Sequence, residues 1–227
     1  MKTICKGFFL ILLVGFGLYC IYQAEHLIKI ISLRSHNPEY TAMMKFNEKD
    51  RLQQINKEWS DYSNISGQIK KAVLAAEDAK FMVHDGFDFE AMEAALKKNM
   101  KYKKVRSGGS TLTQQLAKNI FLSPKKSIYR KIDEAFITIM METVLSKKRI
   151  LELYLNNVEW GRGVYGIEAA SRHYYGVTNT SLDAYQAARL ASMLTNPRGF
   201  ERNIGSEYLD EKTNIIFKRM ELVDYPK

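Results

Sequence analysis

The feature that most constrains the fold is an uncharged run of 18 residues near the N-terminus, from Gly7 to Ala24. As a helix rising about 1.5 Å per residue, it would be roughly 27 Å long, close to the hydrocarbon thickness of a bilayer. A lysine at the centre of such a span would cost about 2.5–3.5 kcal/mol, so the absence of charge is informative. Lys2 and Lys6 favour a cytoplasmic N-terminus. The sequence predicts a cytoplasmic tail over 1–6, a transmembrane anchor over 7–24 and an exported remainder.

Two other interpretations of this run fit less well. A cleaved signal peptide would end in small residues, and the I-Y-Q-A-E sequence that closes the run is a poor cleavage site. A lipidated Cys20 would follow a small residue, whereas Tyr19 is bulky. Both cysteines, Cys5 and Cys20, lie in or beside the run, so the predicted exported part has none. That composition suits an oxidising compartment.

The length of the chain limits the number of domains, and its net charge limits the class of partner. A chain of 227 residues has room for one domain with a sizeable core, or for two small ones. Its net charge of +9 favours a negatively charged partner, either nucleic acid, anionic lipid or a phosphorylated substrate. Two cysteines exclude a disulfide scaffold and a structural zinc site. Because the domain is expected outside the cytoplasm, we expect no nucleic acid among its partners.

Most of the chain after residue 65 is patterned for helices. Ile69, Ala72, Val73 and Ala76 recur on one helical face. Further helices are expected over Phe89 to Leu96, Ser110 or Thr111 to Ala117, Ile128 to Leu145, Lys147 to Leu155, Gly166 to Tyr174, Leu182 to Leu194 and Glu207 to Leu222. Alternating strand patterns are scarce, so the sequence predicts an all-α domain.

A helix of small and apolar residues ends in two acids, Glu77 and Asp78, and His84 follows in the next loop. A carboxylate beside an apolar surface suits general base chemistry. Taken alone, such a pair is more often structural, bound to Lys80 or to a backbone amide, and a lone His84 would be structural too.

Two further segments carry polar groups at helical spacing. The segment from Arg106 to Asn119 combines two glycines, which let a ligand approach the backbone, with several donors. These donors are Ser110, Thr111, Gln114, Gln115 and Lys118. Thr111, Gln115 and Lys118 share a face that suits a sugar and a diphosphate, although a threonine there is also an ordinary helix cap. The second pair, Arg130 and Glu134, is either a surface ion pair worth under about 1 kcal/mol or an acid and a cation that meet a phosphate.

A basic run precedes these donors. Six of the ten residues from Lys97 to Arg106 are basic. The run is either a solvated charge cluster or a loop that attracts anionic lipid.

The order and spacing of these motifs resemble those of the family 51 glycosyltransferases, the peptidoglycan polymerases. The motif E-D-x-x-F-x-x-H-x-G is matched by Glu77, Asp78, Phe81, His84 and Gly86, and R-K-x-x-E by Arg130, Lys131 and Glu134. G-G-S-T-x-x-Q-Q-x-x-K-N is matched from Gly108 to Asn119, Y-L-N-x-x-x-x-G from Tyr154 to Gly161, and L-A-x-x-x-x-N-P from Leu190 to Pro197. Gly67 stands where the family often has proline, and Gln186 where an acid is common.

The resemblance implies a monofunctional enzyme with a lysozyme-like, two-lobed helical fold, in which a head sits above a membrane-facing jaw. Residues 25–64 would form a connecting and jaw-proximal segment, 65–202 the glycosyltransferase domain, and 203–227 a C-terminal helix packed on that domain. The protein would lie in the bacterial inner membrane as a single-pass protein, with the catalytic domain on the outer, periplasmic face. Membrane lipids and other cell-wall synthesis proteins are further expected partners.

The resemblance also implies an activity: polymerisation of lipid II into β-1,4-linked glycan strands, with release of undecaprenyl diphosphate and inversion in a single displacement. Glu77 would be the general base and Glu134 the second catalytic acid, which would also bind a divalent metal, Mg²⁺ or Mn²⁺. Asp78, Phe81, His84, Ser110, Thr111, Gln114, Gln115, Lys118 and Arg130 would bind substrate. Two alternatives stay open, a lysozyme-like lytic enzyme and an inactive cell-wall scaffold.

Overall fold

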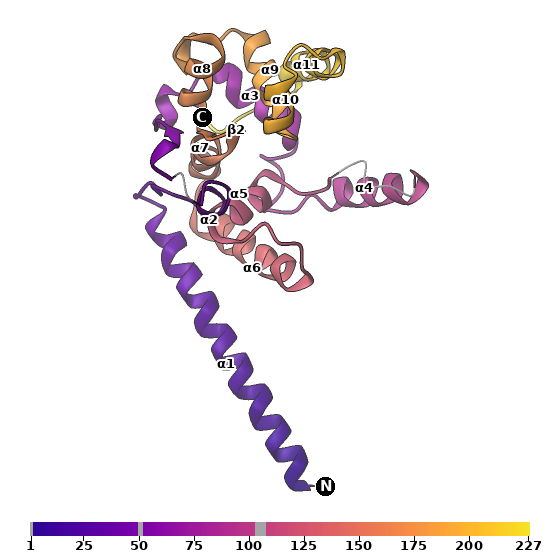
Figure 1. Ribbon diagram of the computed structural model, residues 1–227. Coiled ribbons are helices and arrows are strands. Elements are labelled where there is room, and N and C mark those ends of the chain that lie inside the picture. The colour runs from indigo at the N-terminus through magenta and orange to yellow at the C-terminus, as the bar shows by residue number, and fades with distance from the viewer. Residues whose placement is uncertain (1, 50–51, 103–107) are drawn as a thin grey trace.

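Helices make up most of the chain, as its apolar periodicity predicts (Figure 1). The computed structural model describes residues 2–49, 52–102 and 108–227. Its α-helices are α1 (Lys2–Ser32), α2 (Ala42–Asn47), α3 (Gly67–Glu77), α4 (Phe89–Tyr102), α5 (Leu112–Phe121), α6 (Ile128–Val144), α7 (Lys147–Asn157), α8 (Ile167–Tyr175), α9 (Ala184–Met193), α10 (Pro197–Arg202) and α11 (Glu207–Arg219). Short 3-10 helices are η1 (Leu52–Gln54), η2 (Tyr62–Asn64), η3 (Asn179–Ser181) and η4 (Met220–Leu222).

Polar caps start several of these helices. Thr111 and Gln114 exchange side-chain and backbone hydrogen bonds, so α5 begins with a capping box. Asp183 and Gln186 form the same box at α9, so the glutamine that departs from the family pattern completes the cap. The pair Asn196-Pro197 starts α10, which is not among the expected helices, because asparagine caps it and proline fits the first helical position.

A small three-stranded sheet departs from the all-α prediction. Its central strand β3 (Val164–Tyr165) pairs in parallel with β1 (Asn56–Lys57) and antiparallel with β2 (Glu159–Gly161). Strands of two or three residues are too short for an alternating pattern to be recognised, which explains why the sequence did not predict them. The fold is therefore mostly helical, with one short sheet beside α8.

The helical core is centred on α3 and α9, which pack against each other and against α11. Leu209 and Ile216 of α11 are buried, and α11 packs against α9 and α3. Gly67, at the start of α3, lies under the Tyr225 ring, and a Cβ there would come within 2.8 Å of the Tyr225 hydroxyl. This close contact accounts for a glycine where the family often has proline.

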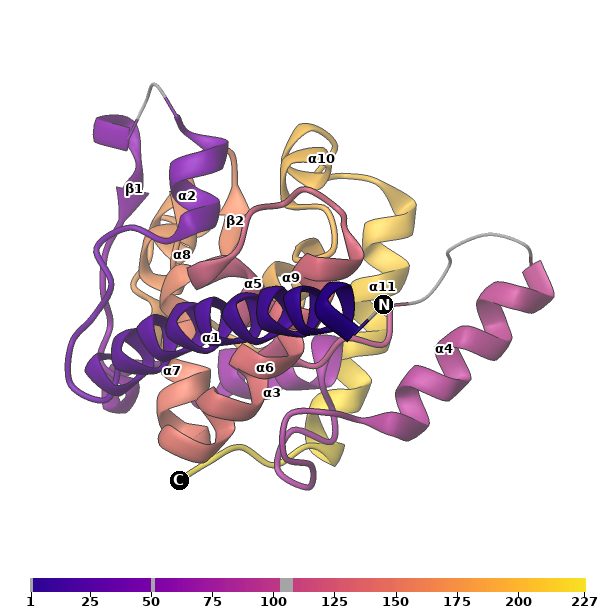
Figure 2. The same cartoon turned by 90° about the horizontal axis from the view of Figure 1, so that it is seen from below.

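The first helix extends far beyond the others, yet its second half is attached to the domain (Figures 1 and 2). The Tyr19 hydroxyl and the Gln23 amide both donate to Asp133 Oδ1 of α6, each over 3.1 Å. Within the part of the chain that the structure describes, no helix combines the length and the apolar character that a membrane crossing requires. The transmembrane role of 7–24 stays a prediction.

The fourth helix projects to one side of the molecule (Figure 1). Its apolar side chains Phe89, Leu96 and Met100 are exposed. Residues 97–102 of the predicted basic run form its last turns, whereas residues 103–107 lie outside the described residues.

Candidate active site

Glu77 is the last residue of α3, where the backbone leaves the helix at Asp78. Its Oε2 accepts a hydrogen bond of 2.8 Å from the Gln115 amide of α5. Its Oε1 is buried and has no hydrogen-bond partner among the described residues. The carboxylate is therefore fixed at one oxygen and free to accept a proton at the other.

Gln115 is itself fixed by Tyr154 of α7, whose hydroxyl donates to Gln115 Oε1 over 3.1 Å. Burial raises the pKa of Tyr154 well above its usual range, and the charges of Glu77 and Asp78 raise it further. The hydroxyl therefore stays protonated and keeps donating. A chain of two neutral donors, from Tyr154 to Gln115 to Glu77, orients the carboxylate without placing a cation on it.

Asp78 and His84 hold the backbone next to Glu77 in place through hydrogen bonds. Asp78 Oδ2 accepts from the backbone N–H of Leu112 over 2.9 Å, and so supplies a partner for one of the N–H groups in the first turn of α5 that have none within the helix. The other oxygen, Oδ1, lies 2.9 Å from His84 Nε2. The Gly86 N–H donates to His84 Nδ1, so the proton of the neutral ring is on Nε2 and points at Asp78. These bonds tie the loop after α3 to the start of α5.

Glu134, on α6, has a different environment from Glu77. Its side chain is 3% exposed, and its Oε2 accepts from Arg130 over 2.6 Å. Its Oε1 accepts from Lys131. Both oxygens therefore carry a cation. The Arg130 Nε is buried with no hydrogen-bond partner in the described part of the chain, so that guanidinium has capacity for one more acceptor.

The two acids line neighbouring cavities. The Glu77 cavity, of about 290 Å³, has a wall formed by residues 108–111. The Glu134 cavity, of about 250 Å³, is lined by Gln115, Lys118 and four further charged residues, which are Lys126, Arg130, Lys131 and Glu134. Ser110 lines both cavities, and Gln115 reaches from the second to Glu77. The two predicted catalytic acids thus line two cavities that share Ser110, and we call these two cavities together the cleft.

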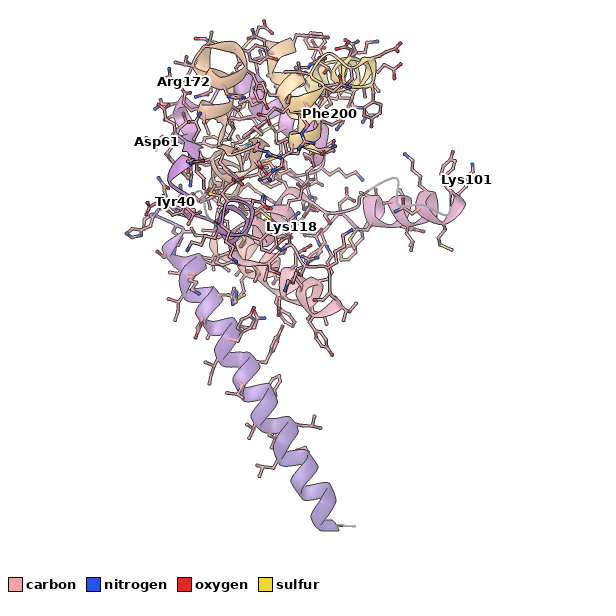
Figure 3. The ribbon with its side chains drawn as sticks, in the orientation of Figure 1. Tyr40, Asp61, Lys101, Lys118, Arg172 and Phe200 are labelled. Atoms are coloured by element: carbon pink, nitrogen blue, oxygen red, sulfur yellow. The ribbon has the colours of Figure 1, made fainter. Side chains whose placement is uncertain are left out.

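Lys118 of α5, labelled in Figure 3, lines the Glu134 cavity. Its side chain forms no hydrogen bond or ion pair with any residue that the structure describes. Burial lowers its pKa, which is also affected by the charges of Glu134, Arg130, Lys131 and Glu77. Four cations face one carboxylate in the Glu134 cavity, so its net charge is positive and it suits a diphosphate.

Comparison with known proteins identifies the family. The model of the transglycosylase family matches residues 43–221. A biosynthetic peptidoglycan transglycosylase of Nitrosomonas eutropha is 46% identical over 226 residues, which cover 96% of this chain and 90% of that protein. Those of Dechloromonas aromatica and Nitrosospira multiformis are 45% and 44% identical, and at least 97% of each chain is covered. The chain belongs to the transglycosylase family.

The structure of this transglycosylase places the predicted site residues in two groups. Those that line one or both cavities are Glu77, Asp78, Ser110, Thr111, Gln114, Gln115, Lys118, Arg130 and Glu134. The other two, Phe81 and His84, line neither of these cavities. Phe81 is 1% exposed and packs in the core, and the side chains of Thr111 and Gln114 are also used in the α5 cap. Direct substrate contact by any of these residues stays a prediction.

Several cleft residues of the transglycosylase were not predicted. Lys126 and Met43 line the Glu134 cavity, and Arg219, from the end of α11, lines the Glu77 cavity. Lys131 and Tyr154 lie in the family motifs R-K-x-x-E and Y-L-N-x-x-x-x-G, and only this could have suggested that they belong to the site. Met43 and Arg219 are distant in sequence from any motif, so only the fold brings them to the site.

The residues of the Glu134 cavity do not fit a preformed divalent-metal site. Such sites need several oxygen ligands, whereas both Glu134 oxygens are bound to cationic side chains. No group of three or more His, Cys, Asp or Glu side chains within the described residues is arranged to hold a metal. Metal binding by this transglycosylase at Glu134 stays a prediction that its donor set does not favour.

Proposed function

We propose lipid II as the substrate of this transglycosylase, which is a peptidoglycan glycosyltransferase. It polymerises lipid II into β-1,4-linked glycan and releases undecaprenyl diphosphate, with inversion at the anomeric carbon in a single displacement. The observation that carries this proposal is the pairing of a carboxylate that has one free oxygen with a positively charged cavity in the same cleft. A sugar diphosphate already has a good leaving group, so the enzyme needs a base, cations and positioning.

Glu77 is the proposed general base. Its free Oε1 takes the proton from the 4-hydroxyl of the acceptor sugar, while the Gln115 amide holds Oε2 in place. The Glu77 cavity is the space in which that acceptor sugar lies. A positioned base of this kind contributes about 10²–10⁴-fold to the rate.

The Glu134 cavity is the proposed site for the departing diphosphate. Among the described residues Lys118 is unpaired and Arg130 has a free Nε, so both have donors for phosphate oxygens. Glu134 holds Arg130 and Lys131 side by side, which offsets their mutual repulsion and prepares them for the charge that develops on the leaving group. No step here requires a metal.

Residues 7–24 are the proposed membrane anchor, within a lysozyme-like fold whose jaw faces the bilayer. The described side chains from Phe9 to Leu18 are apolar or glycine, and the large ones are exposed, with Phe9 at 63% and Phe16 at 67%. Ile128 and Tyr129 of α6 are also exposed, on the part of the domain from which α1 extends (Figure 2). The catalytic domain then lies on the outer face of the inner membrane, beside its lipid substrate.

One experiment separates this function from lysis and from an inactive scaffold. The full chain is incubated in detergent with lipid II alone and, separately, with finished glycan strands. We expect lipid II to be converted to long glycan and the finished strands to keep their length. Shortened strands would instead indicate a lytic enzyme, and no change in either substrate would indicate a scaffold.

A further inference from the structure

A third cavity, of about 330 Å³, lies where α1 joins the domain, and we call it the α1–α2 cavity. Its walls are His26 and Lys29 of α1, Tyr40 and Lys45 around α2, and Phe121 at the end of α5. Tyr40 marks the place at the upper end of α1 in Figure 3. None of its lining residues has a part in the proposed reaction.

The α1–α2 cavity and the Glu134 cavity are formed by different residues of the same two helices. On α2, Met43 lines the Glu134 cavity, whereas Ala42 and Lys45 line the α1–α2 cavity. On α5, Lys118 lines the first, and Ile120 and Phe121 line the second. A ligand of the α1–α2 cavity would therefore bind at a separate site from the diphosphate.

The charge of the α1–α2 cavity is positive and uncompensated. Lys29 and Lys45 form no side-chain hydrogen bond or ion pair with any described residue. Over the described ranges of the chain, no carboxylate lines the cavity. Two unpaired ammonium groups around one pocket favour an anionic ligand.

The shape of the site is fixed by a buried histidine. His26 is 6% exposed, and its Nδ1 donates to the Tyr22 carbonyl over 2.9 Å, which holds the ring against Phe121 with the ring centroids 5.5 Å apart. Leu33 beside it is also buried. The cavity therefore has a rigid, partly apolar wall rather than only mobile lysine side chains.

Apolar surface continues from the cavity along α1. Leu18, 63% exposed, and Tyr22, 39% exposed, lie on the turns of α1 before His26, on the same helical face as Lys29. An amphiphile with an anionic head and apolar tails matches this combination, whereas free phosphate matches only the lysines.

We propose that the α1–α2 cavity binds the phosphodiester headgroup of an anionic phospholipid, with its acyl chains along α1. The proposal rests on the proposed anchoring of α1 in the bilayer, and it is independent of the chemistry at Glu77. Lys29 and Lys45 bind the phosphate oxygens, and the wall of His26 and Phe121 contacts the glycerol end of the tails.

The test uses the full chain in neutral detergent and measures binding of phosphatidylglycerol and phosphatidylcholine by native mass spectrometry. We expect a preference for phosphatidylglycerol that Lys29→Gln/Lys45→Gln reduces about 30-fold, because each lysine contributes about a factor of five at a membrane surface. The matched control is Lys71→Gln/Lys218→Gln, which removes the same charge at a cavity between α3 and α11 and should leave the preference unchanged.

A second variant distinguishes binding inside the cavity from general electrostatic attraction to its lysines. Ala42→Phe fills the cavity and leaves every charge in place, so it should weaken phosphatidylglycerol binding as well, with folding checked by circular dichroism. Normal lipid binding by Ala42→Phe, an equal loss in the control pair, or displacement of the lipid by millimolar inorganic phosphate would each overturn the proposal.

Failure of the proposed activity, or of the proposed membrane anchor, would give different results. Lipid II polymerisation is measured on the same preparation, and its absence alongside selective lipid binding would count against the activity and not against this site. Flotation with phosphatidylcholine vesicles tests anchoring, and a full chain that floats with neither lipid would overturn both the anchor and the lipid site.

Discussion

The two acids of the cleft are the same residue type and differ almost completely in their surroundings. Glu134 is buried, and each of its oxygens is bound by a cation. Glu77 has one oxygen bound by a neutral amide and the other unpaired among the described residues. The first arrangement neutralises a charge and fixes two cationic side chains, whereas the second leaves a lone pair available for a proton.

This difference indicates which acid takes the proton in the proposed reaction and which one holds the cations. Proton transfer to Glu134 would disrupt its ion pairs with Arg130 and Lys131. A carboxylate that is oriented by a neutral donor can accept a proton without such a loss. The predictions below are designed to change one acid or its support while leaving the other intact.

The largest effect is expected from Glu77→Gln. The substitution keeps the shape of the side chain and removes the proton acceptor, so lipid II polymerisation should fall by about 10²–10⁴-fold. Circular dichroism should show a folded protein. The control is Glu90→Gln, which removes an exposed charge at the start of the neighbouring α4 and should be nearly fully active. Near-normal turnover by Glu77→Gln would remove the base from the mechanism.

Glu134→Gln should lower kcat/KM by about 10²-fold, because Arg130 and Lys131 lose the group that holds them together. It should also lower the melting temperature, which Glu77→Gln should not, since two buried or half-buried cations lose their partner. Glu142, also on α6, forms an ion pair with Lys147 of α7 outside both cavities, and Glu142→Gln serves as the control for stability. Equal melting temperatures for the Glu77 and Glu134 variants would show that the two ion pairs of Glu134 do not contribute to the stability of the fold.

The sequence predicts much of this fold because its helices carry local signals. The cap at Thr111, the end of α3 at Glu77 and the helix beginning at Lys147 are all encoded within a few residues. The small sheet is not predicted, because its strands are too short to show alternation and β1 pairs with β3 across about a hundred residues. The helix α10 is missed because a proline ends one helix and begins another with the same signal.

The site is predicted less completely than the fold. Glu77, Gln115, Lys118 and Glu134 all reach the cleft, since their motifs place them on faces of α3, α5 and α6. Sequence spacing does not reveal that the Phe81 ring turns into the core, because an aromatic residue in a loop has no periodic face. Nor does it reveal Arg219, which comes to the Glu77 cavity only through the packing of α11.

Removing the support of Glu77 should have a smaller effect than removing the acid. Tyr154→Phe deletes the hydroxyl that donates to Gln115 and should lower kcat by about 3–10-fold, corresponding to one hydrogen bond, with KM unchanged. Tyr165→Phe makes the same chemical change at a buried tyrosine bound to Asn47, away from the cleft, and should leave kcat unchanged. A change in KM alone for Tyr154→Phe would contradict a role in orienting the base.

The smallest effect at neutral pH is expected from substitution of Lys118, which lines the Glu134 cavity. Burial lowers its pKa, and the positive charges of Arg130 and Lys131 lower it further, against the opposing influence of Glu134 and Glu77. The side chain is charged below its pKa and loses its proton as the pH rises through it. The KM for lipid II should therefore begin to rise at a lower pH than for an ordinary lysine, because a neutral amine no longer attracts the diphosphate. Lys118→Arg keeps its charge over this range, so its KM should stay flat where that of the native protein rises. The measurement is KM between about pH 7 and 10 for both proteins, and parallel curves would show that Lys118 does not bind the diphosphate as a cation.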